Sequence, residues 1–201
     1  MDKQNIKKIP KIIAVSKTFS LDKILPLIEN QHIDYGENKV QEAVDKWTDI
    51  KSKNLNIKLH MIGKLQTNKV KFAVKLFDYI HSVDSEKLAK KISDEQTKIN
   101  RKIKIFIQVN IGNEYQKSGI NKNEISNLIN YSRKINLDVI GLMCIPPIDM
   151  KVDKYFKEMN LLNNKFGFKE LSMGMSSDYL KATENCSTFL RIGSNIFGQR
   201  Y

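Results

Sequence analysis

Short apolar runs alternate along the whole chain with longer stretches in which apolar and polar residues are mixed at helical spacing. The apolar runs predict strands at residues 11–16, 33–35, 58–62, 79–83, 103–110, 139–144, 170–173 and 189–192. The mixed stretches predict helices at residues 21–31, 38–50, 67–76, 85–100, 122–135, 151–166, 177–184 and from 195 to the end. Strict alternation of strand and helix, with strands that are apolar throughout, indicates a parallel sheet covered on both faces.

Eight strand-helix units in 201 residues fit a closed barrel. The expected fold is therefore of the α/β class, a single (β/α)8 TIM barrel near the lower size limit of that architecture. We expect one domain over residues 1–201. The alternative is an open flavodoxin-like sheet, which would need fewer strands and a clear switch point in strand order.

Basic residues exceed acidic ones by 34 to 22, which gives a formal net charge of +12. Such an excess can indicate binding to nucleic acid or to an anionic membrane surface. However, 30 of the basic residues are lysines, and the sequence has no RNA-reading motif. We interpret the charge as a solvated lysine surface and predict neither a nucleic-acid nor a membrane partner.

Cys144 and Cys186 lie far apart and lack metal-ligand spacing, which is typical of free thiols in a reducing cytosol. The N-terminal residues lack an apolar stretch of signal-peptide length, and no run elsewhere is long enough to span a bilayer. We expect a cytoplasmic protein without a metal site.

Two segments near the C-terminus, residues 171–178 and 189–198, each read as a buried strand that breaks into a Gly/Ser turn and opens a helix. Such turns present backbone N–H groups to an anion, and the loops after the last two strands of a barrel are a common phosphate site. Ser176, Ser177, Gly193 and Ser194 would supply the hydroxyl and N–H groups. The alternative is two ordinary helix caps.

Lys17 directly follows the first predicted strand, which in a closed barrel neighbours the last one. A lysine at the barrel mouth would be partly desolvated and near other cations, which lowers its pKa and favours the neutral amine that attacks a carbonyl. Lys17 beside a phosphate site suggests a phosphorylated aldehyde held as a Schiff base. The alternative is ordinary surface charge.

Three further residues are candidates for contact with a ring. Arg191 precedes the Gly193 turn, and its guanidinium could only donate a hydrogen bond to a pyridine nitrogen; its alternative is a surface or carboxylate-paired arginine. Asn38 and His60 lie in polar segments at the second and third strand ends, where they could touch a ring substituent. For His60 a satisfied core histidine is an equal alternative.

Several ordered strings resemble the pyridoxal phosphate homeostasis protein family. They are AVSKT at 14–18, YGENKVQEA at 35–43, HMIGKLQTNK at 60–69, SVDS at 82–85, KSGI at 117–120, GLMCIPP at 141–147, SMGMSSD at 172–178 and RIGSNIFGQR at 191–200. The resemblance spans nearly the whole chain. It implies a barrel that binds pyridoxal 5′-phosphate (PLP), with Lys17 as the Schiff-base lysine.

Similarity to the related barrel of alanine racemases implies that Arg191 faces the pyridine nitrogen and that Ser176, Gly193 and Ser194 take the phosphate. Asn38, His60 and Met173 complete the predicted cofactor-binding set. The role implied by the resemblance is to hold and deliver the cofactor in vitamin B6 homeostasis, without an established reaction. Candidate partners are PLP-dependent apoenzymes and amino acids, and a monomer is expected.

The alternative function is a PLP-dependent amino-acid racemase. A racemase with this barrel needs a second base, supplied by an additional β domain and a partner subunit, and we expect this chain to end before such a domain. In addition, Arg191 at the ring nitrogen would weaken the electron sink that carbanion chemistry uses. The sequence therefore favours a non-catalytic carrier.

Overall fold

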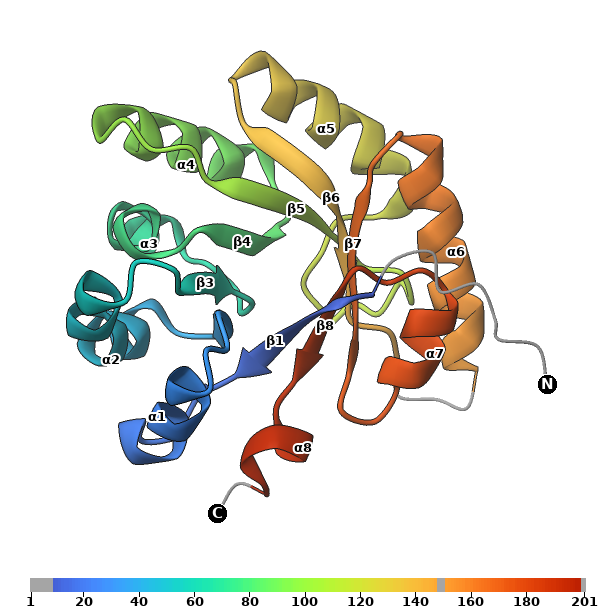
Figure 1. Cartoon of the computed structure of the whole chain (residues 1–201). Helices are drawn as coiled ribbons and strands as arrows, with labels where there is room; N and C mark the ends of the chain where they lie inside the picture. Colours follow the sequence, from blue (N-terminus) through green and yellow to red (C-terminus); the bar gives the residue numbers. More distant parts are fainter. Residues whose placement is uncertain (1–8, 148–150, 200–201) are drawn as a thin grey trace.

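The computed structural model describes residues 9–147 and 151–199, and eight parallel strands in sequence order close into a barrel (Figure 1). The strands are β1 (Lys11–Val15), β2 (Asp34–Glu37), β3 (Lys58–Met61), β4 (Tyr79–Val83), β5 (Lys104–Val109), β6 (Asp138–Cys144), β7 (Glu170–Met175) and β8 (Phe189–Ile192). Strand β1 pairs with both β2 and β8, which closes the sheet. The predicted (β/α)8 barrel is confirmed.

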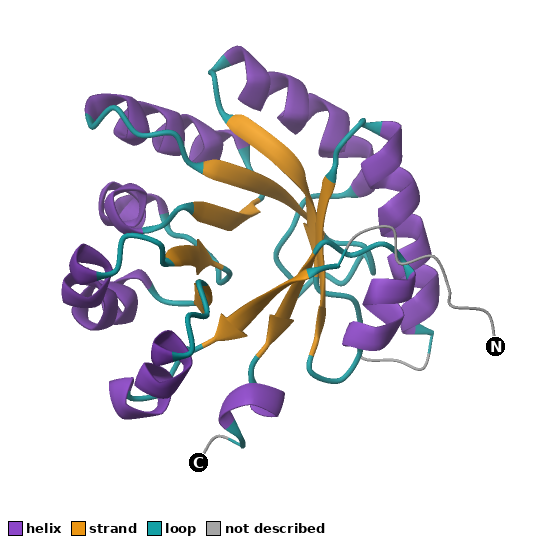
Figure 2. Ribbon diagram, viewed as in Figure 1, coloured by secondary structure: helices purple, strands orange, loops and turns teal. Residues whose placement is uncertain are grey.

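The helices lie outside the strands (Figure 2). They are α1 (Leu21–Glu29), α2 (Val40–Lys53), α3 (Val70–Leu76), α4 (Glu86–Lys98), α5 (Ile125–Lys134), α6 (Val152–Lys165), α7 (Tyr179–Glu184) and α8 (Ser194–Phe197), with the 3₁₀ turns η1 (Thr67–Lys69) and η2 (Lys122–Glu124). A side-chain cap fixes the start of α4, where the Ser85 hydroxyl accepts a hydrogen bond from the Leu88 N–H. The helices bury apolar residues against the barrel, for example Ile24 on α1, Ala43 on α2 and Ile92 on α4.

Several predicted elements begin or end at different residues in the structure. The second strand begins at Asp34 rather than Ile33, which is 44% exposed, and it continues to Glu37. The last helix does not run to the end of the chain within the described residues, because α8 stops at Phe197 and Gly198 follows with a φ of +84°. Residues 200–201 of that prediction lie outside the described residues.

Strand β7 continues two residues past its predicted end and contains a bulge. Its Ser172 is aligned with Phe189 and its Met175 with Arg191, so three steps on β7 match two on β8. The extra residue changes which side chains face inward after it. Gly174 at the bulge has a φ of +91°, and an added Cβ would lie 2.5 Å from the Ala182 Cβ. The bulge therefore requires glycine.

The core has two layers, as expected of a barrel. Between strands and helices lies a large apolar layer, which contains Trp47, the largest fully buried side chain of the described residues. Inside the barrel a smaller cluster contains Ile13, Tyr79, Phe106, Met143 and Phe189. This inner cluster fills the barrel interior on the side of the strand starts, and the cavity described below lies on the side of the strand ends.

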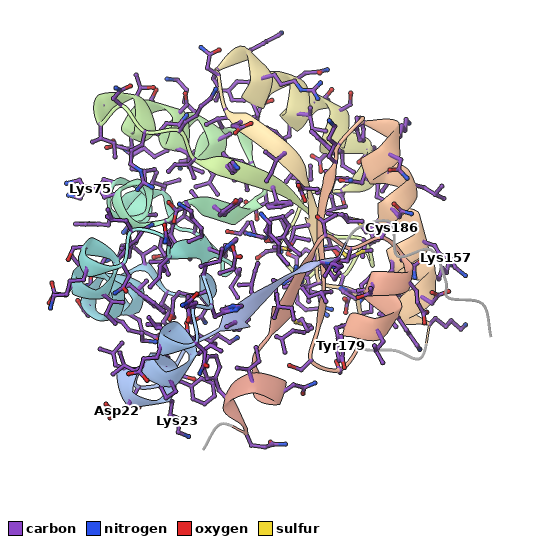
Figure 3. All side chains as sticks on the ribbon, viewed as in Figure 1. Asp22, Lys23, Lys75, Lys157, Tyr179 and Cys186 are labelled. Carbon is purple, nitrogen blue, oxygen red and sulfur yellow. The ribbon has the colours of Figure 1, made fainter. Side chains whose placement is uncertain are left out.

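The surface agrees with the lysine-rich interpretation: Lys23, Lys75 and Lys157 lie at the periphery of the molecule (Figure 3). In the described residues both cysteines are free, Cys144 buried and Cys186 exposed. Residues 9–147 and 151–199 include no helix long and apolar enough to cross a membrane. They also include no cluster of side chains suited to hold a metal ion.

Candidate cofactor site at the barrel mouth

A cavity of about 740 Å³ opens where the strands end. Its lining residues are Val15, Lys17, Asn38, Ile62, Gly63, Ile145, Met175, Ser176, Ser177, Arg191, Gly193, Ser194, Asn195 and Gln199. They come from the carboxyl ends of the strands and the loops that follow, which is where barrel proteins place their sites. The volume lies within the range usual for small-molecule sites.

Six of the eight predicted cofactor-binding residues meet in this lining. They are Lys17, Asn38, Ser176, Arg191, Gly193 and Ser194. The barrel therefore brings together residues that are up to 177 positions apart in the sequence. Their contact with a cofactor stays a prediction, but their common location at one cavity is a property of the fold.

The other two predicted residues do not line the cavity. His60 is fully buried, with Nε2 bonded to Asp34 at 2.9 Å and Nδ1 to His81 at 3.0 Å, so it is the core histidine of the alternative interpretation. Met173 belongs to the apolar layer between strands and helices. Because the bulge at Gly174 changes the facing of the strand, Met175 takes its place in the lining.

Several lining residues escaped sequence reasoning. Ile62, Ile145 and Met175 supply an apolar wall, and Gln199 lies at the rim. A glycine inside an apolar strand is a signal for a bulge, so Gly174 could have identified Met175. The apolar positions carried no such signal, because they look like any core residue.

The turn that carries Lys17 is fixed from below by the buried carboxylate of Glu37. Its Oε1 accepts from the Ser16 hydroxyl at 2.8 Å, from the Trp47 indole at 2.9 Å and from the Lys46 ammonium at 3.0 Å. Glu37 is fully buried and the Lys46 side chain is only 9% exposed. Helix α2 thus clamps the residue before Lys17.

The residue after Lys17 is held as well. The Thr18 N–H donates to Glu42 Oε1 at 2.6 Å, and Thr18 has a φ of +67°, an uncommon conformation for a residue other than glycine. Lys46 contacts the same Glu42 oxygen at 3.0 Å and also donates to the Ser16 carbonyl. Burial raises the pKa of Glu42, but the Thr18 N–H and Lys46 lower it further, so the net pKa lies below its ordinary value.

The loops after β7 and β8 are joined to each other. The Gly193 N–H donates to Ser176 Oγ at 3.2 Å, and the Asn195 amide donates to the Ser176 carbonyl at 3.2 Å. The N–H groups of Ser194 and Asn195 stand in the first turn of α8, where no intrahelical acceptor exists. No described residue accepts from them, so they remain available to an anion.

Arg191 provides a buried cation at the cavity and is only 4% exposed. Its Nη1 donates to Ser172 Oγ at 2.7 Å and its Nη2 to the Cys144 carbonyl at 2.8 Å. Burial lowers the pKa of Arg191, yet a guanidinium stays charged at physiological pH. None of the carboxylates in the described residues forms an ion pair with it.

Asn38 presents a buried oxygen without a partner among the described residues. Its backbone is approached so closely by Gly63 that a Cβ added to that glycine would lie 2.4 Å from the Asn38 carbonyl oxygen. The third strand end therefore supports the second one. An unsatisfied acceptor next to a cavity is the kind of group that a ligand hydroxyl or N–H completes.

Taken together, the cavity offers a lysine amine, a cation that can only donate, backbone N–H groups suited to an anion, and an apolar wall. These groups match a flat molecule with an electrophilic carbonyl, an anionic substituent and a ring acceptor.

Comparison with known proteins agrees with this geometry. Residues 3–201 match the family described as alanine racemase, N-terminal domain. A pyridoxal phosphate homeostasis protein of Aquifex aeolicus is 36% identical over 200 residues, which cover 94% of this chain and 87% of the relative. PipY of Synechococcus elongatus, solved with PLP bound, matches with a TM-score of 0.87 at 30% identity and covers 94% of this chain and 92% of PipY.

A more distant likeness concerns the fold alone. Alanine racemase of Clostridium difficile matches with a TM-score of 0.74 at 16% identity, over 98% of this chain and 55% of the racemase chain.

Proposed function

Because the chain belongs to the pyridoxal phosphate homeostasis proteins of the alanine racemase N-terminal domain family, we propose that it binds PLP and serves intracellular vitamin B6 homeostasis. In this proposal Lys17 holds the cofactor covalently and the protein later delivers it. The observation that carries the proposal is that Lys17, Arg191 and the two joined loops line one cavity.

The residues that line the cavity fit PLP. The cofactor supplies an aldehyde that condenses with a primary amine, a phosphate, and a pyridine ring with one nitrogen acceptor. Lys17 would supply the amine, and the Ser194 N–H and the Ser176 hydroxyl would hold the phosphate. The N–H of Gly193, the third predicted phosphate residue, donates to Ser176 Oγ, so the Asn195 N–H would act in its place. The unpartnered oxygen of Asn38 would accept from a ring substituent.

The clamped turn fixes the backbone on both sides of Lys17, which lines the cavity. Glu37, Glu42 and Lys46 hold both neighbours of Lys17, so the side chain starts from a fixed backbone. The apolar wall of Ile62, Ile145 and Met175 excludes water from one side of the cavity. Both effects favour a stable covalent complex over rapid hydrolysis.

We propose a carrier rather than an enzyme. Arg191 cannot give up its proton at physiological pH, so it favours an unprotonated ring nitrogen and a weak electron sink. Racemisation also needs a base on each side of the reacting carbon, and among the lining residues only Lys17 has a suitable side chain. PLP-dependent apoenzymes would receive the cofactor, and amino acids would help to displace it.

The proposal is tested with two measurements on the purified protein. Titration with PLP should produce visible absorption, and pyridoxal, which lacks the phosphate, should bind far more weakly. Incubation of the loaded protein with L-alanine in deuterated water should give negligible exchange at the α-carbon. Failure of PLP to bind would contradict the proposal, whereas exchange at about 1 per second or faster, with appearance of the D-isomer, would favour the racemase alternative.

A further inference from the structure

A chain of buried hydrogen bonds runs beneath the cavity and ends at Arg191. It links Asp34 Oδ1 to His60 Nε2 at 2.9 Å, His60 Nδ1 to His81 Nε2 at 3.0 Å, His81 Nδ1 to Ser172 Oγ at 2.9 Å, and Ser172 Oγ to Arg191 Nη1 at 2.7 Å. The members come from β2, β3, β4, β7 and β8. The chain therefore crosses the barrel interior from one wall to the other.

When both imidazole rings are neutral, the chemistry of the two ends fixes the direction of every link. An ionised carboxylate only accepts and a guanidinium only donates. His60 must then donate to Asp34 through Nε2, which leaves its Nδ1 to accept from His81. His81 in turn accepts from the Ser172 hydroxyl at its Nδ1, and the Ser172 oxygen accepts from Arg191.

Aromatic rings seal this chain from solvent. Tyr79 stacks on His60 with ring centres 4.3 Å apart, and Phe106 stacks on His81 at the same distance. Phe189 lies against both histidines. Burial lowers the pKa of His60 and that of His81, which keeps both rings neutral as the fixed direction requires.

We propose that Asp34, His60, His81 and Ser172 form a directed relay that positions Arg191 and sets the hydrogen bond it offers to the ring nitrogen of a cofactor in the cavity. This inference rests on the proposed function, in which Arg191 faces that nitrogen. Asp34 is the negative end of the relay and Arg191 the positive end, four hydrogen bonds apart. The carboxylate of Asp178 also acts on the guanidinium electrostatically, without forming an ion pair with it.

The relay offsets part of the free-energy cost of burying the Arg191 guanidinium. A buried cation without a carboxylate partner is unfavourable, and Arg191 is not paired with any carboxylate of the described residues. Aligned hydrogen bonds in a dry interior polarise one another. A break in the relay would therefore loosen the guanidinium and change its donor strength without touching the cavity wall.

The first test needs no variant and no cofactor. The chain has three histidines, so long-range ¹H–¹⁵N spectra of the wild-type protein resolve each ring. The relay requires the Nε2–H tautomer for both His60 and His81, each with Nδ1 as an acceptor. The Nδ1–H tautomer or a charged ring at either position near neutral pH would overturn the relay.

The second test reads the far end of the relay in the loaded protein. Ser172→Ala removes the link next to Arg191, and Ser132→Ala is the matched control, since both serines are fully buried and Ser132 lies on α5 with no partner among the described residues. With ring-¹⁵N-labelled PLP, Ser172→Ala should move the ring-nitrogen resonance and release the cofactor about fivefold to tenfold faster, the effect of one lost hydrogen bond.

The outcomes separate the relay from the proposed function. If PLP binds the wild type and its ring resonance is the same in Ser172→Ala and in Ser132→Ala, the relay is wrong and the binding function stands. If PLP does not bind the wild type at all, the proposed function fails and the inference falls with it. Equal resonance shifts in both variants would also contradict the relay, because they would reflect general loosening of the barrel.

Discussion

The buried relay beneath the cavity and the mouth of the barrel both contain polar groups, but they differ in whether those groups have hydrogen-bond partners. In the relay, His60, His81 and Ser172 have each polar atom engaged by a neighbour. At the mouth, Asn38 Oδ1 and the N–H groups of Ser194 and Asn195 lack a partner among the described residues. The comparison teaches that residue type does not identify a site, whereas unsatisfied hydrogen-bonding capacity beside a cavity does.

Two lysines near the mouth differ in where they lie. Lys46 is engaged by Glu37, Glu42 and the Ser16 carbonyl and holds structure together. Lys17 lines the cavity, where a reactive molecule can reach it. Mutations in the clamp should therefore mainly alter stability and mutations at the mouth should mainly alter binding, whereas mutations in the relay should affect both.

The largest effect on stability is expected for Lys46→Met. The change leaves the buried carboxylate of Glu37 without its cation, which should lower the free energy of unfolding by about 3 to 5 kcal/mol. Urea denaturation measures it, with Lys53→Met, an exposed site on the same helix, as the control. Equal midpoints for the two variants would contradict the clamp.

The next effect concerns pH. Burial lowers the folded-state pKa of His60 and His81, so below about 6.5 the unfolded chain takes up protons that the folded protein does not. Stability should fall as pH drops from 7 toward 5, by up to about 1.4 kcal/mol per pH unit for each histidine. His81→Phe, which can keep the stack on Phe106, should reduce this slope. A stability independent of pH over the range would be inconsistent with buried neutral histidines.

At the mouth, Ser176→Ala should weaken PLP binding with little change in stability. A hydrogen bond to a charged phosphate is worth about 1.5 to 3 kcal/mol, which corresponds to roughly a tenfold to hundredfold loss of affinity. Pyridoxal serves as the control ligand, since its binding should be unaffected. An equal loss for the two aldehydes would show that Ser176 does not contact the phosphate.

The smallest effect is expected for Asn38→Ala. Its Oδ1 has no partner among the described residues, so its removal should leave the unfolding midpoint unchanged. One neutral hydrogen bond to the cofactor would be lost, at about 1 kcal/mol or roughly fivefold in affinity. Calorimetric titration checks the affinity. A clear loss of stability with unchanged affinity would show that Asn38 supports the fold and does not contact the cofactor.

Much of the fold could be predicted because short, continuously apolar strands and longer amphipathic helices leave different patterns in the sequence, and eight alternations of the two in a short chain fit few architectures. The common location of Lys17 and the two Gly/Ser turns could also be predicted. A barrel brings the carboxyl ends of its strands together wherever they fall in the sequence.

The parts of the site that could not be predicted depend on contacts between residues far apart in the sequence. The facing of Met173 and Met175 is decided by a single extra residue at Gly174, and His60 carries no mark that distinguishes a core position from a ligand contact. The relay joins His81 to Ser172 across 91 positions, and the Lys17 clamp depends on side chains of α2. Such links become visible only when the barrel is closed.

The most direct test of the central claim is borohydride reduction of the PLP-loaded protein followed by peptide mapping. The hydride reduces the bond between cofactor and lysine and makes the attachment permanent. We expect a single pyridoxyl group on the peptide that contains Lys17, and none in Lys17→Ala, with Lys23→Ala as a surface control that labels normally. A label on another lysine in the wild type, or equal labelling of Lys17→Ala, would contradict the assignment of Lys17 as the cofactor-holding residue.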